Sequence, residues 1–276
     1  FALYVPASMD SDPEAAWNHA ESLYKGVIRT LAANPDKAAL ALDPVQAYEN
    51  QKNDRFSVFI GLENGSPVGR SIGKLAELYD MGVRYMTLCH SGNNEICDSC
   101  APSVKRWGGL SPFGKEVVKE MNRVGMLIDL SHAAESTFYD VLECSTQPVV
   151  CSHSSCRALC DHPRNLTDGQ LKAIAAKGGV VQVTMYSGFL CKEGEATLAD
   201  FIRHLEHAIA VAGIDHVGIG TDFDGDGTVI GCADASQLKN VTKELLRRGY
   251  SECDIEKIWG GNWLRVMTRV QEVNGN

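Results

Sequence analysis

The sequence lacks the features that mark several large classes of protein. It contains no run rich in lysine and arginine, and its 26 basic and 35 acidic residues give a formal net charge of −9. This balance argues against nucleic acid or an anionic membrane surface as the main partner. No apolar run approaches the roughly 20 residues of a membrane-spanning helix, and the first residues do not follow a signal-peptide pattern. We therefore expect no nucleic-acid partner and no membrane span.

Motifs of several enzyme and cofactor classes are missing as well. No serine or cysteine stands in the G-x-S-x-G turn of a nucleophile elbow. The C-x-x-C at Cys97 and Cys100 has no second pair at zinc-finger spacing, so we interpret it as part of a loop. The glycine-rich strand end at residues 218–226 carries three aspartates, which would repel a nucleotide phosphate. These absences leave a metal site that activates water as the most economical mechanism.

The cysteines leave the cellular compartment open. There are ten, at scattered positions, and several lie inside apolar runs. We interpret most of them as buried, reduced thiols. Cys160 and Cys191 follow two neighbouring predicted strands and would be able to pair in an oxidising compartment. A cytoplasmic location is favoured, with an exported form as the alternative.

Short apolar runs alternate with amphipathic stretches along the chain. Seven runs are predicted strands: residues 2–6, 56–62, 83–89, 126–130, 149–152, 180–185 and 217–220. Most are apolar throughout, as expected for parallel strands buried on both faces. Three helices are predicted to begin where a capping residue precedes a proline, at Asp12-Pro13, Asp43-Pro44 and Ser111-Pro112. Closing helices are predicted at residues 236–247 and 260–270.

This alternation predicts an α/β protein, specifically a (β/α)8 TIM-type barrel. The length suits one domain of residues 1–276, and no repeat or linker marks a boundary. A closed barrel needs eight strands, whereas seven are found. Because the chain opens directly on a strand, we expect the missing strand to precede Phe1.

Polar residues stand at the ends of several predicted strands, which in a barrel meet on one face. Glu63 ends the run 56–62, where its carboxylate either bridges two cations or caps the turn before Gly65. His132 and His153 are 21 residues apart, one strand–helix–strand step. This spacing predicts that they lie at adjacent strand ends and share one Zn²⁺.

Asp222 follows the last predicted strand, where it can bind metal and accept a proton from the attacking water. The run Asp222-x-Asp224-x-Asp226-Gly also looks like the start of a calcium loop. That interpretation is disfavoured, because Ala233 stands where the loop needs its twelfth-position glutamate.

Two further positions are candidates for contact with substrate. His90 ends the run 83–89 and is either a turn residue or a group that polarises a carbonyl or steadies an oxyanion. Arg157 and Arg164 lie in the loop after His153, where a guanidinium either pairs with a substrate carboxylate or is merely solvated. Four other titratable residues are interpreted as surface or core: Asp129, His162, His204 and His207.

Motifs spread along nearly the whole chain resemble those of the membrane (renal) dipeptidase family, zinc peptidases among the amidohydrolase-like metal barrels. The matching pieces include Gly61-Leu-Glu-Asn-Gly65, Met81-Gly-Val-Arg-Tyr-Met-Thr-Leu-Cys-His90, Gly109-Leu-Ser-Pro-Phe-Gly-Lys-Glu-Val-Val118, Leu127-Ile-Asp-Leu-Ser-His132, Ser152-His-Ser-Ser155, Arg164-Asn165, Gly220-Thr-Asp-Phe-Asp-Gly225 and Gly260-Gly-Asn-Trp-Leu-Arg-Val266. Each piece alone is weak, and their common order makes the resemblance specific.

The resemblance implies a binuclear zinc site with two Zn²⁺ per complete chain. Glu63 would bridge both metals, and His132 and His153 would hold the second zinc. Asp222 would complete the first zinc and act on the bridging hydroxide.

The resemblance also implies how a dipeptide substrate is held. His90 would assist at the scissile carbonyl or the tetrahedral intermediate, and Arg164 would grip the C-terminal carboxylate. It further implies tolerance of D-residues at the C-terminal position, some β-lactam hydrolysis, and a homodimer. The alternatives are another binuclear barrel hydrolase of the lactonase or phosphotriesterase type, or a non-catalytic barrel that lacks its first metal.

The sequence departs from the family at the first zinc. The family supplies a His-x-Asp from its first strand, and this sequence has none near its start. The nearest approach, His19-Ala-Glu21, lies in a predicted helix. Residues 1–6 resemble the family's second strand, so several tens of preceding residues are expected to carry the first. Without them, the first zinc would keep only Glu63 and Asp222, too few for tight binding.

Overall fold

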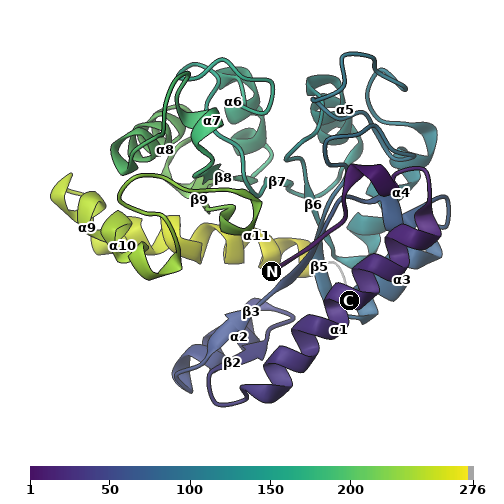
Figure 1. The fold of residues 1–276 in the computed structure, drawn as a ribbon, viewed down its shortest axis with the longest axis horizontal. Coiled ribbons are helices and arrows are strands. Elements are labelled where there is room, and N and C mark those ends of the chain that lie inside the picture. The colour runs from purple at the N-terminus through teal and green to yellow at the C-terminus, as the bar shows by residue number, and fades with distance from the viewer. Residues whose placement is uncertain (273–276) are drawn as a thin grey trace. The chain divides into compact units, whose positions relative to one another are not determined.

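The computed structural model describes residues 1–272, which form two compact units (Figure 1). Unit 1 comprises Phe1–Pro148 together with the chain from Met267 onward, and unit 2 is Val149–Val266. Each unit has its own parallel strands with helices packed beside them.

Unit 1 is built on four parallel strands that pair in the order β1, β4, β5 and β6. Their bounds are Ala2–Tyr4, Ile60–Glu63, Val83–Thr87 and Leu127–Asp129. The register places one residue of each strand in a single row: Tyr4, Glu63, Thr87 and Asp129. Since successive side chains along a strand alternate between faces, this row points to one face at the carboxyl ends of the strands.

Five α-helices belong to unit 1 and are separated in sequence by its strands (Figure 1). They are α1 Pro13–Ala33, α2 Pro44–Lys52, α3 Gly73–Asp80, α4 Pro112–Val124 and α5 Glu135–Cys144, with short 3-10 helices η1 Ala7–Met9 and η2 Ser66–Val68. All three predicted helix starts are confirmed. The side chains of Asp12, Asp43 and Ser111 each accept a hydrogen bond from a first-turn N–H, the stabilising arrangement of an N-cap.

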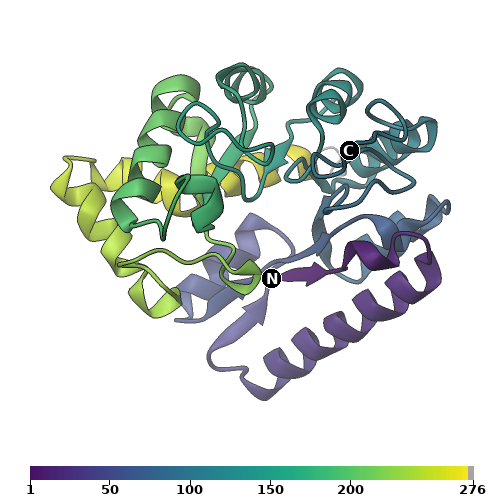
Figure 2. The same cartoon turned by 45° about the horizontal axis from the view of Figure 1, so that its top comes forward.

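The predicted strand at residues 56–62 is two strands in the structure. Phe56–Val58 (β3) pairs with a strand that the sequence did not indicate, Ala38–Leu40 (β2), and α2 packs on this small sheet (Figure 2). Ile60–Glu63 (β4) joins the main strands. The side chains differ accordingly, because Phe56 is 81% exposed while Ile60 is fully buried. A continuous apolar run does not specify which neighbour each half will pair with.

Unit 2 contains three parallel strands in the order β7, β8 and β9, namely Val150–Cys151, Val180–Thr184 and Val217–Gly220. Its helices are α6 Asp168–Ala176, α7 Ser187–Leu190, α8 Leu198–Ala212, α9 Lys239–Arg247, α10 Glu252–Glu256 and α11 Asn262–Gln271, whose end belongs to unit 1. Single turns lie at η3 Ile214–His216, η4 Phe223–Gly225, η5 Ala235–Gln237 and η6 Lys257–Gly261. The two closing helices predicted from the sequence therefore begin two to three residues later than expected.

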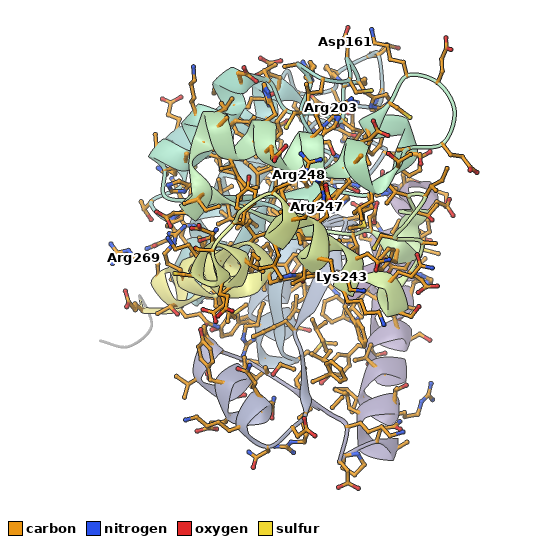
Figure 3. The ribbon with its side chains drawn as sticks, turned by 90° about the vertical axis from the view of Figure 1, so that its left-hand side faces the viewer. Asp161, Arg203, Lys243, Arg247, Arg248 and Arg269 are labelled. Atoms are coloured by element: carbon orange, nitrogen blue, oxygen red, sulfur yellow. The ribbon has the colours of Figure 1, made fainter. Side chains whose placement is uncertain are left out.

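Ion pairs join two helices on the face of unit 2 shown in Figure 3. Arg248 lies 2.6 Å from Glu206 of α8 and 2.8 Å from Glu244 of its own helix. Arg247 also pairs with Glu244, at 2.7 Å. The arginines that cluster on this face are therefore largely neutralised within the chain.

Close backbone approach explains one glycine near the predicted site. A Cβ built on Gly220, at the end of β9, would lie 1.9 Å from the carbonyl oxygen of Ser152. Only glycine lets these two segments pack so closely. Cys160 and Cys191, which would be able to pair in an oxidising compartment, are separate thiols in the structure. Among residues 1–272, no helix combines the length and the apolar character needed to cross a membrane.

Candidate metal centre

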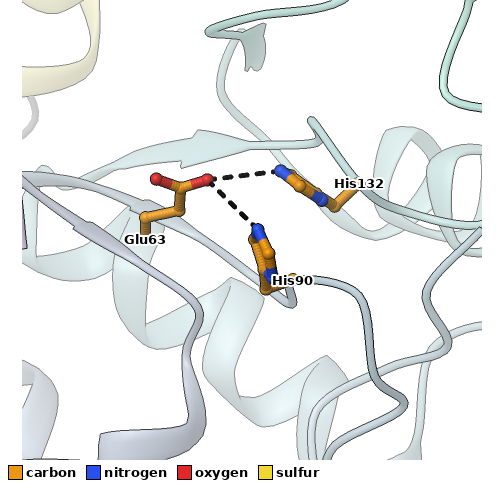
Figure 4. A group of neighbouring side chains, drawn as sticks. All are labelled: Glu63, His90 and His132. Carbon is orange, nitrogen blue, oxygen red and sulfur yellow. Dashed lines mark ion pairs between the residues drawn. The ribbon is translucent and has the colours of Figure 1, made fainter. Parts of the chain in front are cut away.

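Three side chains from three neighbouring strands meet at the carboxyl ends of unit 1 (Figure 4). Glu63 is the last residue of β4, and His90 and His132 follow β5 and β6 by three residues each. The Glu63 Oε1 atom lies 3.2 Å from His132 Nε2 and 3.8 Å from His90 Nε2. The two imidazole rings are 4.1 Å apart between centroids. The sequence predicted each as a strand-end residue, and the structure brings them together.

The donor set of this cluster fits a divalent metal ion. One ligand atom from each of Glu63, His90 and His132 lies within 4.8 Å of the other two, and all three side chains are partly buried. Two imidazole nitrogens and a carboxylate oxygen are ligands that Zn²⁺ commonly takes. Catalytic zinc sites of this type use three protein ligands and keep a further position for water or substrate.

His132 is held in a turn with a left-handed backbone, φ +69°. The N–H of Ala133 donates to the carbonyl of Leu130 at 3.2 Å, which closes the turn. A left-handed conformation costs a residue other than glycine roughly 1–2 kcal/mol. A neighbouring group secures it, since the N–H of Cys100 donates to the His132 carbonyl at 2.8 Å.

A polar network fixes the backbone beside Glu63. The Asp10 carboxylate accepts hydrogen bonds from the Asn64 amide at 2.8 Å and from the Ser66 hydroxyl at 2.5 Å. The Asn64 amide also donates to the carbonyl of Val5 at 3.1 Å. Burial raises the pKa of Asp10, and the two hydrogen bonds oppose that rise. Since Asn64 directly follows Glu63, the network anchors the end of β4.

Tyr4 is a neighbour of the cluster that the sequence did not single out. It ends β1 in register with Glu63, and its ring meets the edge of His90 at 4.9 Å between centroids. Burial raises the pKa of Tyr4, with further contributions from Glu63 and Asp10. The hydroxyl is therefore a neutral hydrogen-bond donor at neutral pH. The first predicted strand runs to residue 6, so Tyr4 lies inside it, and only the observed end of β1 at Tyr4 reveals this position.

The remaining predicted site residues, His153, Arg164 and Asp222, belong to unit 2. His153 follows β7 by two residues and is buried, as is Arg164. The Arg164 guanidinium donates to the carbonyl of His153 at 3.2 Å and to the Ser154 hydroxyl at 3.4 Å, and it lies 5.2 Å from the ring centre of Phe189. These hydrogen bonds hold the loop that carries Arg164 against the end of β7.

The Arg164 guanidinium is suited to bind an anion. Within residues 1–272, no carboxylate oxygen lies within 4.0 Å of it, in contrast to the paired arginines of α9. The pKa of neighbouring His162 is lowered first by burial and then by the charges of Arg164 and Arg157, and Asp161 opposes this shift. A buried cation without a carboxylate partner is costly unless a ligand compensates it.

Asp222 has the acid–base properties of a proton acceptor near neutral pH. It follows β9 with a left-handed backbone, φ +61°, and its carbonyl accepts from the N–H groups of Gly225 and Gly227. Burial raises the pKa of Asp222 to about 7, opposed by Arg164 and reinforced by Asp224 and Asp226. A carboxyl group with such a pKa can take up and release a proton at neutral pH.

Comparison with known protein families and sequences gives a consistent result. A model of the membrane dipeptidase family (peptidase family M19) matches residues 1–276. Dipeptidase verJ of Clonostachys rogersoniana is 41% identical over 253 residues, which are 90% of this chain and 64% of that protein. Dipeptidase aclJ of Aspergillus oryzae is 40% identical over 222 residues, 79% of this chain and 53% of that protein. The chain thus spans between about half and two thirds of the length of these relatives.

Comparison with solved structures also gives dipeptidases. The probable dipeptidase PvdM from Pseudomonas aeruginosa superimposes with a TM-score of 0.92 at 29% identity, covering 98% of this chain and 82% of that one. A metallopeptidase from Rhodobacter sphaeroides, solved with a phosphinate mimic of the dipeptide L-Ala-D-Ala, gives a TM-score of 0.89 at 26% identity, covering 98% and 86%. This likeness confirms the predicted α/β fold of the barrel type.

Proposed function

Because the chain belongs to the membrane dipeptidase family, we propose that it is a zinc-dependent dipeptidase, which hydrolyses the peptide bond of dipeptides. The observation that carries the proposal is the cluster of Glu63, His90 and His132 at the carboxyl ends of neighbouring strands, in which Glu63 and His132 offer donors suited to a divalent cation and His90 lies beside them. The dipeptidases among its relatives support the substrate class.

Glu63 and His132 are proposed as metal ligands in unit 1, and His153 and Asp222 as ligands in unit 2. Glu63 has two carboxylate oxygens and is suited to bridge two ions. These residues would hold zinc, which would lower the pKa of a bound water to about 7 and polarise the substrate carbonyl. We expect two zinc ions per chain when every ligand is present.

The proton is handled by Asp222. The carboxylate is proposed to accept a proton from the attacking water and deliver it to the leaving amine. His90 is proposed to donate a hydrogen bond to the oxygen of the scissile carbonyl as negative charge develops there. The position of its Nε2 beside Glu63 supports a role next to the metal.

Arg164 is proposed to bind the substrate's C-terminal carboxylate. The guanidinium is buried, and within residues 1–272 it makes no ion pair shorter than 4.0 Å, so its N–H groups are suited to pair with an incoming carboxylate. This preference restricts substrates to short peptides with a free C-terminus. Tolerance of a D-residue at that position is part of the proposal, supported by the L-Ala-D-Ala mimic bound to the R. sphaeroides relative.

The carboxylate preference is tested by Arg164→Ala with Arg157→Ala as the matched control from the same loop. Activity is measured on a dipeptide, on the same dipeptide with its C-terminus amidated, and on a simple ester. Arg164→Ala should lower kcat/KM for the free dipeptide by about 100-fold or more, as expected for a lost charge-assisted pair. It should change the other two substrates little, and Arg157→Ala should change none strongly.

Equal losses on all three substrates would contradict a carboxylate-binding role and favour a hydrolase of the lactonase type.

A homodimer is also proposed, and sedimentation velocity on the purified chain tests it directly. A mass of one chain at micromolar concentration would refute it.

A further inference from the structure

A buried carboxylate that the metal proposal does not use ends the strand that precedes His132. Asp129 ends β6 and, like Thr87 at the end of β5, is fully buried. The two residues are in register, and the Thr87 hydroxyl donates to Asp129 Oδ2 at 2.5 Å. His90 and His132 follow Thr87 and Asp129 by three residues each, so this pair links the two strands that carry the histidines.

The other oxygen of Asp129 shapes the turn that presents His132. Asp129 Oδ1 accepts from the N–H of Ser131 at 3.0 Å, two residues further along the chain. This is an Asx-turn, in which the aspartate side chain takes the place of a backbone acceptor. The turn closed between Leu130 and Ala133 follows at once, with His132 at its left-handed position.

The Asp129 carboxylate can hold this turn only if the carboxylate itself is held. Rotation of its side chain would withdraw Oδ1 from Ser131, and the hydrogen bond from Thr87 to Oδ2 opposes that rotation. The hydroxyl thus acts on the His132 imidazole through a short chain of contacts. Groups that orient metal ligands in this way commonly affect metal affinity about 10- to 100-fold.

We propose that Asp129 and Thr87 are positioning residues for the metal centre: their hydrogen bond locks the Asx-turn that aims His132 at Glu63. This inference rests on the proposed metal site. It assigns a function to a carboxylate whose burial and strand position would otherwise make it a costly core residue.

The test compares Thr87→Val, which has the same shape but no hydroxyl donor, with Thr87→Ser, which restores the hydroxyl. Binding of Co²⁺ and Zn²⁺ to chelator-stripped protein is measured by competition with a chromophoric chelator. The visible spectrum of the Co²⁺ form reports the geometry of the ligands. Circular dichroism at the same temperature establishes that each variant is folded.

Thr87→Val should raise the metal Kd by about 10- to 100-fold and alter the Co²⁺ spectrum, while Thr87→Ser should stay within about threefold of the parent. If Thr87→Val does not fold, Asp129→Asn takes its place, because it keeps an oxygen for Ser131 but loses the charged acceptor of the threonine bond. It should raise the Kd similarly.

A valine or asparagine variant that binds metal as the parent does, with the same spectrum, would overturn this inference and leave the proposed function standing. Failure of the parent protein to bind either metal would overturn the proposed function, and the positioning role with it.

Discussion

His204 should make this protein lose stability as the pH falls below neutral. The side chain is fully buried in α8. Its Nδ1 accepts a hydrogen bond from the N–H of Cys156 at 3.1 Å, and its Nε2 lies 3.1 Å from the carbonyl of Leu190. Both nitrogens are therefore matched to the neutral ring, with Nε2 as the donor. A proton added to Nδ1 would break the bond to Cys156.

The size of the effect follows from the pKa of His204. Burial lowers it from 6.5 to about 4, partly offset by the bond to Leu190. In the unfolded chain the pKa of His204 is near 6.5, so below that pH the unfolded chain binds a proton at His204 that the folded chain does not bind. Stability is therefore full above pH 6.5 and declines as the pH falls toward 4. The total loss is about 3 kcal/mol, of which about 2 kcal/mol is lost between pH 7 and pH 5.

Urea unfolding at pH 7, 6 and 5 measures this loss, with His204→Asn as the comparison. Asparagine keeps an acceptor for Cys156 but does not titrate in this range, so other acidic groups contribute equally to both proteins. The parent should lose about 2 kcal/mol more than the variant between pH 7 and pH 5. Equal losses, or a His204 pKa above 6 by NMR, would refute the argument.

The same acidification bears on the candidate site. Cys156 lies in the loop that carries Arg164, and Leu190 adjoins Phe189, which lies near the Arg164 guanidinium. Protonation of His204 would break its hydrogen bond with Cys156 and bury a charge beside Leu190, and would therefore loosen the two segments that lie near Arg164. We expect KM for a dipeptide to rise as the pH falls toward about 4, the pKa of His204 in the folded chain, and to rise more steeply in the parent than in His204→Asn.

Three further predictions concern the site and its support. His90→Asn should lower kcat by about 100-fold or more without changing the zinc content by mass spectrometry; a lost zinc would instead make His90 a ligand. Dipeptidase activity should vanish after chelator treatment and return with added Zn²⁺; activity that survives complete metal removal would refute the metal mechanism. Gly220→Ala should destabilise the protein by about 3 kcal/mol in urea melts, because the new Cβ meets the Ser152 carbonyl. Gly26→Ala, in open space within α1, should instead stabilise it by about 0.5–1 kcal/mol. Equal changes in unfolding free energy for the two variants would contradict this.

Local sequence signals identified most elements, because they depend on neighbouring residues. Asp12, Asp43 and Ser111 each cap the helix that the following proline begins. The prediction of one strand where the structure has β3 and β4 is wrong, because an apolar run indicates burial and not the identity of the pairing strand. β2 is not predicted from the sequence because its three residues, Ala38–Leu40, are too few to show a strand pattern.

Strand ends are recognisable from the sequence alone, because a polar side chain after an apolar run marks where a buried strand meets solvent. Glu63, His90 and His132 were found in this way. The three-dimensional fold is needed to show that His90 lies within the same cluster as the other two, and that Asp129 is a buried partner of Thr87. Distances between strand ends depend on register and on turns such as the one at His132, and both arise from contacts between residues far apart in the chain.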